Sequence, residues 1–417
     1  MKILLALFMA FTLTFGADAT IEVIKKAETL PSIAVEDASN DYDETFKLRF
    51  FKALIADLNV ISIFNVDRHY RVNDYDASSC VVENKDMDYV LRYEVAELDN
   101  NALGVSIKLM TKDGEVVFSK NYKVGKQNIY MFVAHAIAYD INEFMGEEPV
   151  SWIKRKVIFS KTVAPKKTEI VISDYTLTYQ HVIVKGGFNI FPKWANKKQT
   201  AFYYTSLDGN KPTLKYVDIK KGSLKNLMSS DGMMICSDVS DDGNTLLLTM
   251  APKGQPDIYT YNLQTKKYTK ETNYRGIDVN GQFLERNKIA FISSRLGYPN
   301  VFSKTLGHND VEQMVYYGRS NSACSAHGHY VVYKARETSN AFSENTFNLH
   351  LISTNTDVIR RLTATGVNEF PRFSVDGDAI IFIKNYKRQS AIGIIRLNHN
   401  KNYLFPISGG RVQSLDW

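Results

Sequence analysis

Two stretches in the first third of the chain carry apolar residues at helical spacing. Between Phe46 and Leu58, apolar side chains recur every three or four residues, and Asp43 can cap the start of this run. A second run starts near Asn128, and Gly146 can end it. The pattern therefore predicts two amphipathic helices.

Alternating apolar and polar positions between these two runs predict strands. Tyr89–Val95 is one such segment, and a second covers residues 105–109. The dipeptide Asp113-Gly114 is a strong hairpin signal, and it leads into a third segment at Val116–Val124. A helix, a set of strands and a second helix together predict a small α/β domain.

After the second helical run, a self-similar unit of short alternating strands and turns repeats along the chain. Its clearest copies are FPKWANKKQTAFYYTSLDG from Phe191, CSDVSDDGNTLLLTMAPKG from Cys236 and FPRFSVDGDAIIFIKNYKR from Phe370. Gly243 and Gly377 occupy the same turn in two copies, three periods of about 45 residues apart. This period is the length of a four-stranded propeller blade.

The two ends of the repeat region complement each other. Five copies cover about residues 187–407, whereas the region from Lys156–Ser160 onward supplies only three strands of a further blade. The last residues, Arg411–Trp417, match the start of a blade, with Trp417 in the place of Trp194. We therefore predict an all-β six-bladed β-propeller closed by the C-terminal strand, which leaves no long unpaired edge.

The chain thus divides into three predicted parts. Residues 1–19 combine a positive start, the apolar stretch Ile3–Phe15 and the small-x-small site Ala17–Ala19, which is the layout of a secretory signal peptide. The alternative, a membrane anchor, would need about 20 apolar residues. Residues 20–150 form the α/β domain, and residues 151–417 form the propeller.

Composition and charge narrow the class of partner. The net charge of +6 is spread along the chain without a long basic run, so we expect no nucleic-acid partner. With no other membrane-spanning segment apparent, we expect the exported protein to be soluble, without direct membrane insertion. The three cysteines, Cys80, Cys236 and Cys324, cannot all pair, and we expect them to be buried as small apolar side chains.

Motifs of known chemistry are missing or incomplete. The chain contains no G-x-S-x-G, and SDDGNT at Ser240–Thr245 is one residue short of a sialidase aspartate box. Ser293–Arg295 is interpreted as a link between loops, and a metal pair at His327 and His329 is the less favoured reading of that loop. We predict no catalytic, cofactor-binding or metal-binding residue.

Two alternatives stay open, because sequence spacing does not show which carboxylates converge in a channel. The first is an exported propeller enzyme, peptidase-like or glycan-processing, with a polar cluster of shifted pKa values. The second is a carbohydrate- or ion-binding module with aromatic platforms or an oxygen cage.

The repeats, the domain order and the terminal half-blade resemble the TolB family, the periplasmic component of the Tol-Pal envelope system. The segments FPKWANKKQ, CSDVSDDG, KIAFISSRLG and FPRFSVDG follow the repeat of that family, and the chain ends in VQSLDW. The repeats at residues 196–198 and 326–328 have lost the Asp-Gly turn, which marks a distant member.

The resemblance implies a periplasmic, monomeric, non-catalytic adaptor that supports outer-membrane integrity and cell division. The propeller mouth would bind the peptidoglycan-associated lipoprotein Pal, and an arm at residues 20–30 would bind the inner-membrane protein TolA. The alternative for the arm is an edge strand of the small sheet. The predicted TolA-binding residues of the arm are Thr20, Ile21, Glu22, Val23 and Ile24.

The predicted Pal-binding residues lie where loops enter the first strand of each blade. By repeat position they are Met233, Met234, Ile235, Tyr274, Arg275, Asn321, Ser322, Asn368, Glu369 and Phe370. Met, Tyr, Phe and Arg are residues that carry much of the energy of protein interfaces. The alternative for each of them is packing against its own loop.

Overall fold

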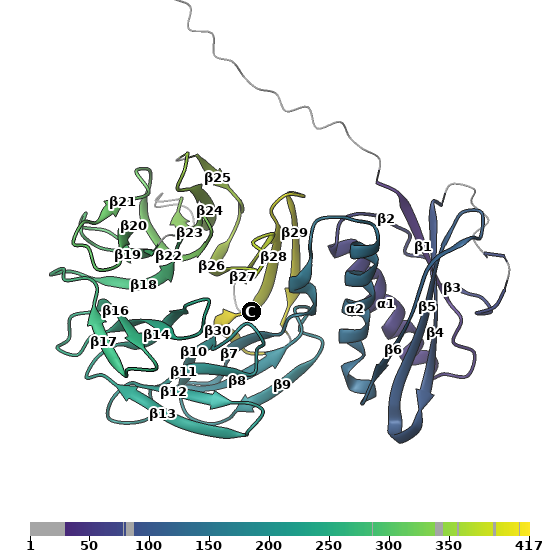
Figure 1. The fold of residues 1–417 in the computed structure, drawn as a ribbon, viewed down its shortest axis with the longest axis horizontal. Helices are drawn as coiled ribbons and strands as arrows, with labels where there is room; N and C mark the ends of the chain where they lie inside the picture. Colours follow the sequence, from purple (N-terminus) through teal and green to yellow (C-terminus); the bar gives the residue numbers. More distant parts are fainter. Residues whose placement is uncertain are drawn as a thin grey trace, which may run out of the picture.

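The computed structural model describes residues 30–77, 79–80, 87–285, 287–337, 345–356, 358–386, 389–407 and 409–417. A small N-terminal α/β region is followed by a β-propeller, and the two helices lie between the propeller and the N-terminal sheet (Figure 1). In this described part of the chain, no helix has the length and apolarity needed to cross a membrane. The predicted signal peptide and all but the last residue of the predicted arm lie outside the described residues.

The N-terminal sheet has the strand order β2-β1-β4-β5-β6, and β3 also pairs with β1. Its strands are β1 (Ser32–Asp37), β2 (Asn65–Val66), β3 (Arg71–Val72), β4 (Tyr89–Leu98), β5 (Ala102–Thr111) and β6 (Val116–Val124). β1 runs parallel to β2, β3 and β4, whereas β4, β5 and β6 are antiparallel. The three strands predicted from alternation are therefore confirmed, and β1 is a strand that the pattern did not predict.

Helices α1 (Glu44–Val60) and α2 (Tyr130–Phe144) confirm the two predicted amphipathic helices. Asp43 caps α1, since its side chain accepts a hydrogen bond from the backbone N–H of Phe46 at 2.8 Å. Short 3-10 turns are η1 (Asp99–Asn101), η2 (Gln127–Ile129) and η3 (Ser151–Lys154). The last of these leads the chain from α2 into the propeller.

The propeller contains four separate four-stranded sheets. The first comprises β30 (Arg411–Asp416), β7 (Val157–Ala164), β8 (Lys167–Ser173) and β9 (Gln180–Val184). The second comprises β10 (Asn189–Trp194), β11 (Ala201–Ser206), β12 (Thr213–Asp218) and β13 (Ser223–Ser229). The third comprises β14 (Met234–Val239), β15 (Thr245–Met250), β16 (Asp257–Asn262) and β17 (Lys267–Lys270). The fourth comprises β18 (Asp278–Phe283), β19 (Lys288–Ser293), β20 (Asn300–Thr305) and β21 (Glu312–Gln313).

A fifth, eight-stranded sheet is built from two antiparallel units. The first unit comprises β22 (Arg319–His327), β23 (Tyr330–Arg336), β24 (Phe347–Ser353) and β25 (Ile359–Arg361). The second comprises β26 (Val367–Phe373), β27 (Ala379–Tyr386), β28 (Gln389–Arg396) and β29 (Lys401–Pro406). A single parallel pair, Phe347 opposite Val367, joins the two units.

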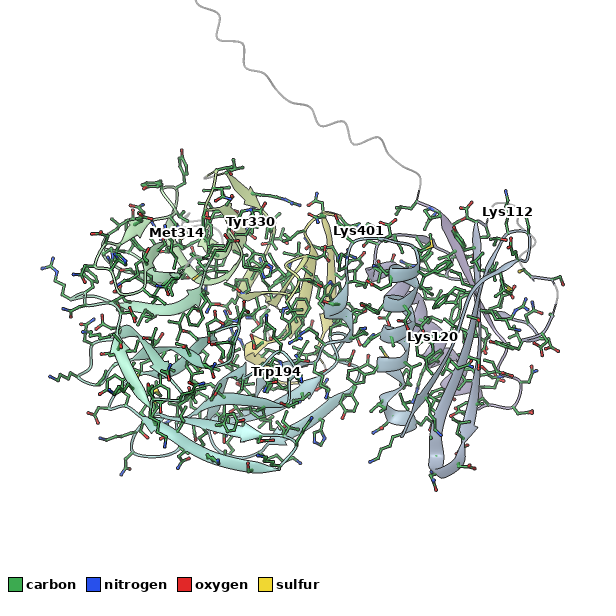
Figure 2. All side chains as sticks on the ribbon, viewed as in Figure 1. Lys112, Lys120, Trp194, Met314, Tyr330 and Lys401 are labelled. Carbon is green, nitrogen blue, oxygen red and sulfur yellow. The ribbon has the colours of Figure 1, made fainter. Side chains whose placement is uncertain are left out.

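The C-terminal strand pairs with the first strand of the propeller, as predicted. β30 is antiparallel to β7, with Leu415 opposite Phe159. The indole of Trp417 donates a hydrogen bond to the carbonyl of Phe373 at 2.8 Å, which ties the chain end to β26 as well. The equivalent strand of the neighbouring sheet carries Trp194, close to the chain end (Figure 2).

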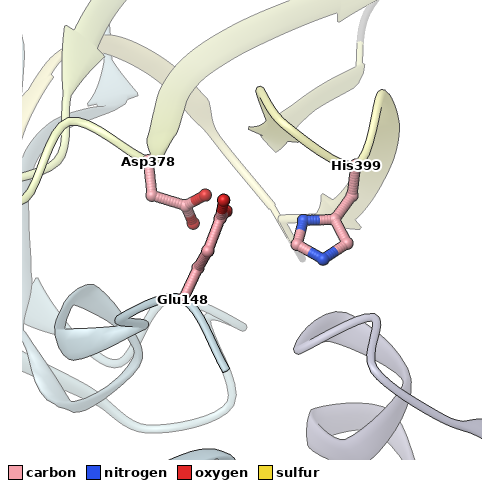
Figure 3. A group of neighbouring side chains, drawn as sticks. All are labelled: Glu148, Asp378 and His399. Carbon is pink, nitrogen blue, oxygen red and sulfur yellow. The ribbon is translucent and has the colours of Figure 1, made fainter. Parts of the chain in front are cut away.

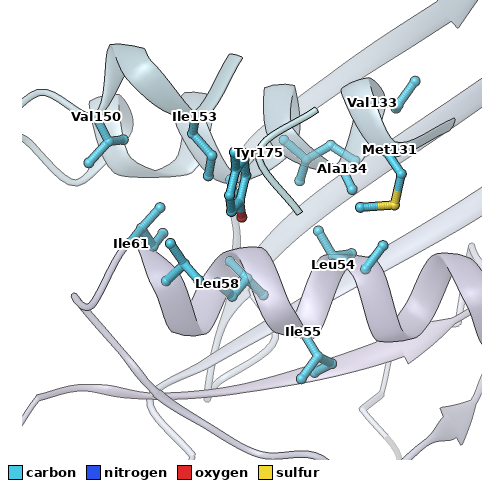
Figure 4. Close-up of a cluster of buried hydrophobic side chains, with 14 of the residues drawn as sticks. Leu54, Ile55, Leu58, Ile61, Met131, Val133, Ala134, Val150, Ile153 and Tyr175 are labelled. Carbon is cyan, nitrogen blue, oxygen red and sulfur yellow. The ribbon is translucent and has the colours of Figure 1, made fainter. Parts of the chain in front are cut away.

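One apolar core continues from the N-terminal region into the propeller. It includes Leu54 and Ile137 from the two helices together with Trp152, Tyr175 and Trp417 from the propeller side. Tyr175 extends from the β8–β9 loop toward α1, between residues of both helices (Figure 4). The two parts therefore share buried surface, which favours a fixed relative orientation.

Buried polar groups also cross this junction. The imidazole Nδ1 of His135 in α2 lies 2.7 Å from the carboxylate of Asp57 in α1, and its Nε2 lies 3.4 Å from Asp174 in the propeller. Arg396 of β28 donates a hydrogen bond to the carbonyl of Ile61 at 2.5 Å, just past the end of α1. Tyr403 donates to the carbonyl of Asn59 at 2.8 Å, so propeller side chains satisfy the C-terminal end of α1.

One cross-strand pair in the propeller gives a first testable expectation. Gly393 lies opposite Phe382, and a Cβ at this glycine would come within 2.2 Å of the Phe382 ring. G393A should therefore lower the free energy of unfolding by roughly 1–3 kcal/mol, because the ring is buried and has to shift. Chemical denaturation measures the loss, and G125A is the control, since a Cβ at Gly125 meets nothing within 4 Å. Equal stability of the two variants would contradict the expectation.

Candidate functional site

The propeller encloses a central cavity of about 310 Å³. Most of its lining comes from six strands, β10, β14, β18, β22, β26 and β30, and from the loops that enter them, and each of these strands is an edge of its four-stranded unit. Each of these inner strands contacts the next, and β30 contacts β10, so they form a closed circle. The apolar part of the lining includes Phe191, Met233, Ile235, Ile277, Val279 and Phe370.

Every inner strand has an irregularity in its pairing at the level of the cavity. Four of the strands have a left-handed residue there: Phe191 (φ 54°), Asn280 (φ 58°), Ala323 (φ 52°) and Phe370 (φ 48°). For a bulky residue such as phenylalanine this conformation is unusual and costs of order 1–3 kcal/mol. The bulges aim Phe191 and Phe370 into the same cavity, where their ring centroids are 6.1 Å apart.

A group of charged side chains lies beside this apolar lining. The ammonium of Lys193 pairs with Asp416 at 3.0 Å and with Asp238 at 3.1 Å, and the guanidinium of Arg372 lies 3.8 Å from Asp416. Burial lowers the pKa of Lys193, but the carboxylates of Asp416 and Asp238 outweigh that effect and raise it overall. Lys193 therefore stays charged near neutral pH, which suits an ion-pairing role and does not suit a general base.

The same polar positions connect adjacent inner strands. Asp416 accepts a hydrogen bond from the backbone N–H of Trp194, and Asp238 accepts one from Phe283, each at 2.9 Å. Ser325 accepts the corresponding bond from Phe373 at 3.2 Å. Each bond joins one four-stranded unit to the next around the cavity. The polar groups thus hold the walls in place.

The structure places four of the ten predicted mouth residues at the cavity: Met233, Ile235, Ser322 and Phe370. Met234 packs in the core beside the cavity, where it is 1% exposed.

Two predicted mouth asparagines are fully buried and tie loops together. Asn321 donates to the side-chain oxygen of Asn300 at 3.0 Å, and Asn368 donates to that of Asn348 at 3.2 Å. For these two side chains the geometry matches the alternative of local packing.

The remaining predicted mouth residues surround the cavity without lining it. The guanidinium carbon of Arg295 lies over the ring of Tyr274, 5.2 Å from the ring centroid. Arg275 is exposed. Glu369 pairs with Lys334 at 3.1 Å. The arm residues Thr20, Ile21, Glu22, Val23 and Ile24 lie outside the described residues.

Several residues that line the cavity were not predicted from the sequence, among them Phe191, Ile277 and Arg372. The repeat contains a signal for Phe191, because FPKW and FPRF place it at the position of Phe370.

Other motifs of the sequence have structural partners. Ser240 and Asp242 bond to each other across their turn at 2.5 Å, and Gly243 there has φ 72°. Arg295 donates to Ser293 at 2.8 Å and pairs with Asp278 at 3.1 Å, as expected for a link between loops.

The cysteines of the propeller are buried and free, as expected for apolar packing. Burial raises the pKa of Cys324 to about 12 and raises that of Cys236 further still. Both thiols therefore stay protonated and poorly reactive near neutral pH. Cys80, in the N-terminal region, is also free and only partly buried.

Fold and cavity together define a class: a β-propeller protein with an N-terminal α/β domain and a central, largely apolar cavity. A family model described as the TolB beta propeller domain matches residues 150–417. The chain is 46% identical to the Tol-Pal system protein TolB of Wolinella succinogenes and 43% identical to that of Campylobacter jejuni strain RM1221, with 100% of both chains covered in each case. The crystal structure of TolB from Acinetobacter baumannii has the same fold, with a TM-score of 0.74, 16% identity, and coverage of 92% of this chain and 96% of that one. This chain belongs to the TolB family of the Tol-Pal system.

Proposed function

We propose that this protein is a non-catalytic periplasmic adaptor whose propeller mouth binds the lipoprotein Pal and whose N-terminal arm binds TolA. In this role it supports outer-membrane integrity and cell division. Residues 1–19 direct export, residues 20–150 form the α/β domain with its arm at 20–30, and residues 151–417 form the propeller. Family membership supports the assignment to the Tol-Pal system, and the choice of these two partners is our inference.

The propeller in this proposal has six blades. The closed circle of six inner strands supports this number, and so does the short strand pairing within the eight-stranded sheet, whose described halves are joined by one ladder pair, Phe347–Val367. Each half has the strand order of a complete blade. The match of the propeller family model to residues 150–417 supports the domain boundary.

The observation that carries the proposal is the cavity itself. Its lining offers Phe191, Phe370, Met233 and Ile235 as apolar contacts at the centre of a ring of loops. Central, desolvated aromatic and methionine side chains are typical of energetic hot spots in protein interfaces. The charged groups beside them are already paired with one another, which leaves the apolar surface as the driving force for binding.

The test uses the mature chain and measures binding of purified Pal and of purified TolA separately. F370A should weaken Pal binding by about 2 kcal/mol, on the order of 30-fold, because it removes an aromatic side chain from the centre of the cavity. TolA binding should be unchanged. Deleting residues 20–30 should abolish TolA binding and leave Pal able to bind.

A matched control is L224E, which alters an exposed apolar side chain on β13, outside the cavity lining. It should bind both partners like the unaltered chain. Thermal unfolding of each variant checks that the fold is retained. Pal binding that F370A leaves unchanged would contradict the proposed mouth, and TolA binding that survives the deletion would contradict the proposed arm.

A further inference from the structure

Three potential metal ligands from separate segments meet where the N-terminal region joins the propeller. Glu148 follows α2, Asp378 lies in the turn between β26 and β27, and His399 lies in the turn between β28 and β29. Their ligand atoms all lie within 4.8 Å of one another. The carboxylates of Glu148 and Asp378 point toward each other, and the ring of His399 lies beside them (Figure 3).

Charge at this cluster is only partly balanced. Asp378 pairs with the buried guanidinium of Arg396 at 2.7 Å and accepts a hydrogen bond from the indole of Trp152 at 3.2 Å. Glu148 accepts a hydrogen bond from the neutral side chain of Asn398 at 2.8 Å. Asp378 thus has a charged partner, whereas the described donor to Glu148 is neutral.

The ligands are held in place by neighbours that belong to the fold. Arg396, which fixes Asp378, also donates to the carbonyl of Ile61 past the end of α1. Asn398, directly before His399, holds Glu148. Such outer contacts orient metal ligands before binding and lower the cost of assembling a site.

We propose that Glu148, Asp378 and His399 bind a Zn²⁺ ion at the junction of the two domains. One imidazole nitrogen and two carboxylate oxygens are ligands that zinc accepts, and a water molecule would complete four-coordination. Calcium fits the group poorly, because it takes six to eight oxygen ligands. A bound ion would fasten the segment after α2 to two turns of the propeller. This site is independent of the proposed partner binding.

The test is calorimetric titration of the full mature chain with Zn²⁺ at pH 7, after treatment with a chelator. We expect saturable binding of one ion per chain and a rise in the thermal unfolding midpoint. H399A should weaken binding by on the order of 100-fold or more, since changing even an outer-shell partner costs about 10–100-fold. E148Q, at an exposed position, should weaken it as well without disturbing the fold.

The control variant is H308A, which removes an exposed histidine from a turn after β20. It should bind Zn²⁺ like the unaltered chain. Cobalt substitution gives a second readout, because the visible spectrum of bound Co²⁺ should change in H399A and stay the same in H308A. Three results would overturn the proposal: no saturable Zn²⁺ binding, an affinity in H399A and E148Q equal to that of the unaltered chain, or loss of binding in H308A alone.

Discussion

H135A is expected to lower the free energy of unfolding by about 3–5 kcal/mol, the range for removing one partner of a buried ion pair. His135 is fully buried between Asp57 of α1 and Asp174 of the propeller. The substitution would leave both carboxylates without their shared cation. Asp57 would keep the hydroxyl of Tyr175 as a donor, and Asp174 would keep the backbone N–H groups of Thr176 and Tyr179.

The same group gives the chain a pH dependence with a defined direction. Burial lowers the pKa of His135, but the two carboxylates outweigh it and raise the pKa from 6.5 to about 9. A raised pKa means that the folded state holds the proton more tightly than the unfolded state. The stability that protonated His135 contributes to the folded state is therefore fully present below about pH 6.5 and is lost as the pH rises to about 9.

At 1.36 kcal/mol per unit, this loss amounts to about 3 kcal/mol. Denaturant titrations of the unaltered chain and of H135A between pH 6 and pH 9.5 measure it. The stability of the unaltered chain should fall across this window, and that of H135A should change much less. H181A, which removes an exposed histidine, should behave like the unaltered chain. Parallel pH profiles for the unaltered chain and H135A would show that His135 is not the group responsible.

R396M should be destabilising by a similar amount, roughly 3–5 kcal/mol, for two connected reasons. Arg396 is fully buried, and its loss leaves the carboxylate of Asp378 without its cation. The carbonyl group of Ile61, just past the end of α1, loses this donor at the same time, while that of Val60 keeps the hydroxyl of Ser62. Methionine keeps most of the side-chain volume, so the loss reports on charge and hydrogen bonding.

A second substitution separates these two causes. In R396M/D378N the buried negative charge is gone, so part of the lost stability should return. R360M is the matched control, because Arg360 is exposed, and it should change the stability by no more than about 0.5 kcal/mol. If the double variant is no more stable than R396M, the unpaired carboxylate is not the cause of the loss.

The hydrophobic periodicity of the sequence predicted those helices and strands that have one buried and one more exposed face. The helices at Glu44–Val60 and Tyr130–Phe144 each bury one face, and the blade strands alternate around turns such as the one at Gly243. Strand β1 escaped prediction because five of its six residues are buried, so Ser32–Asp37 shows no alternation. A short run without alternation has no pattern that distinguishes it from other buried segments.

The site was harder to predict than the fold because its geometry depends on pairings between distant segments. The left-handed backbone at Phe191 and Phe370 arises from bulges, and the residue type does not predict a positive φ at phenylalanine. His135 lies on the buried face of a helical run, and its partner Asp57 is 78 residues away in the sequence. Side chains that meet across a domain junction leave no spacing signal in a single sequence.

The pairing of β30 with β7 also determines when the protein can finish folding. Ser414 of β30 and Ser160 of β7 are 254 residues apart in the sequence. Until the two strands pair, β7 keeps an open edge, and joining them carries the loop-closure entropy of nearly the whole propeller. Such non-local closure slows folding. The unclosed propeller is therefore exposed to proteases and to mispairing with other chains until β30 pairs with β7.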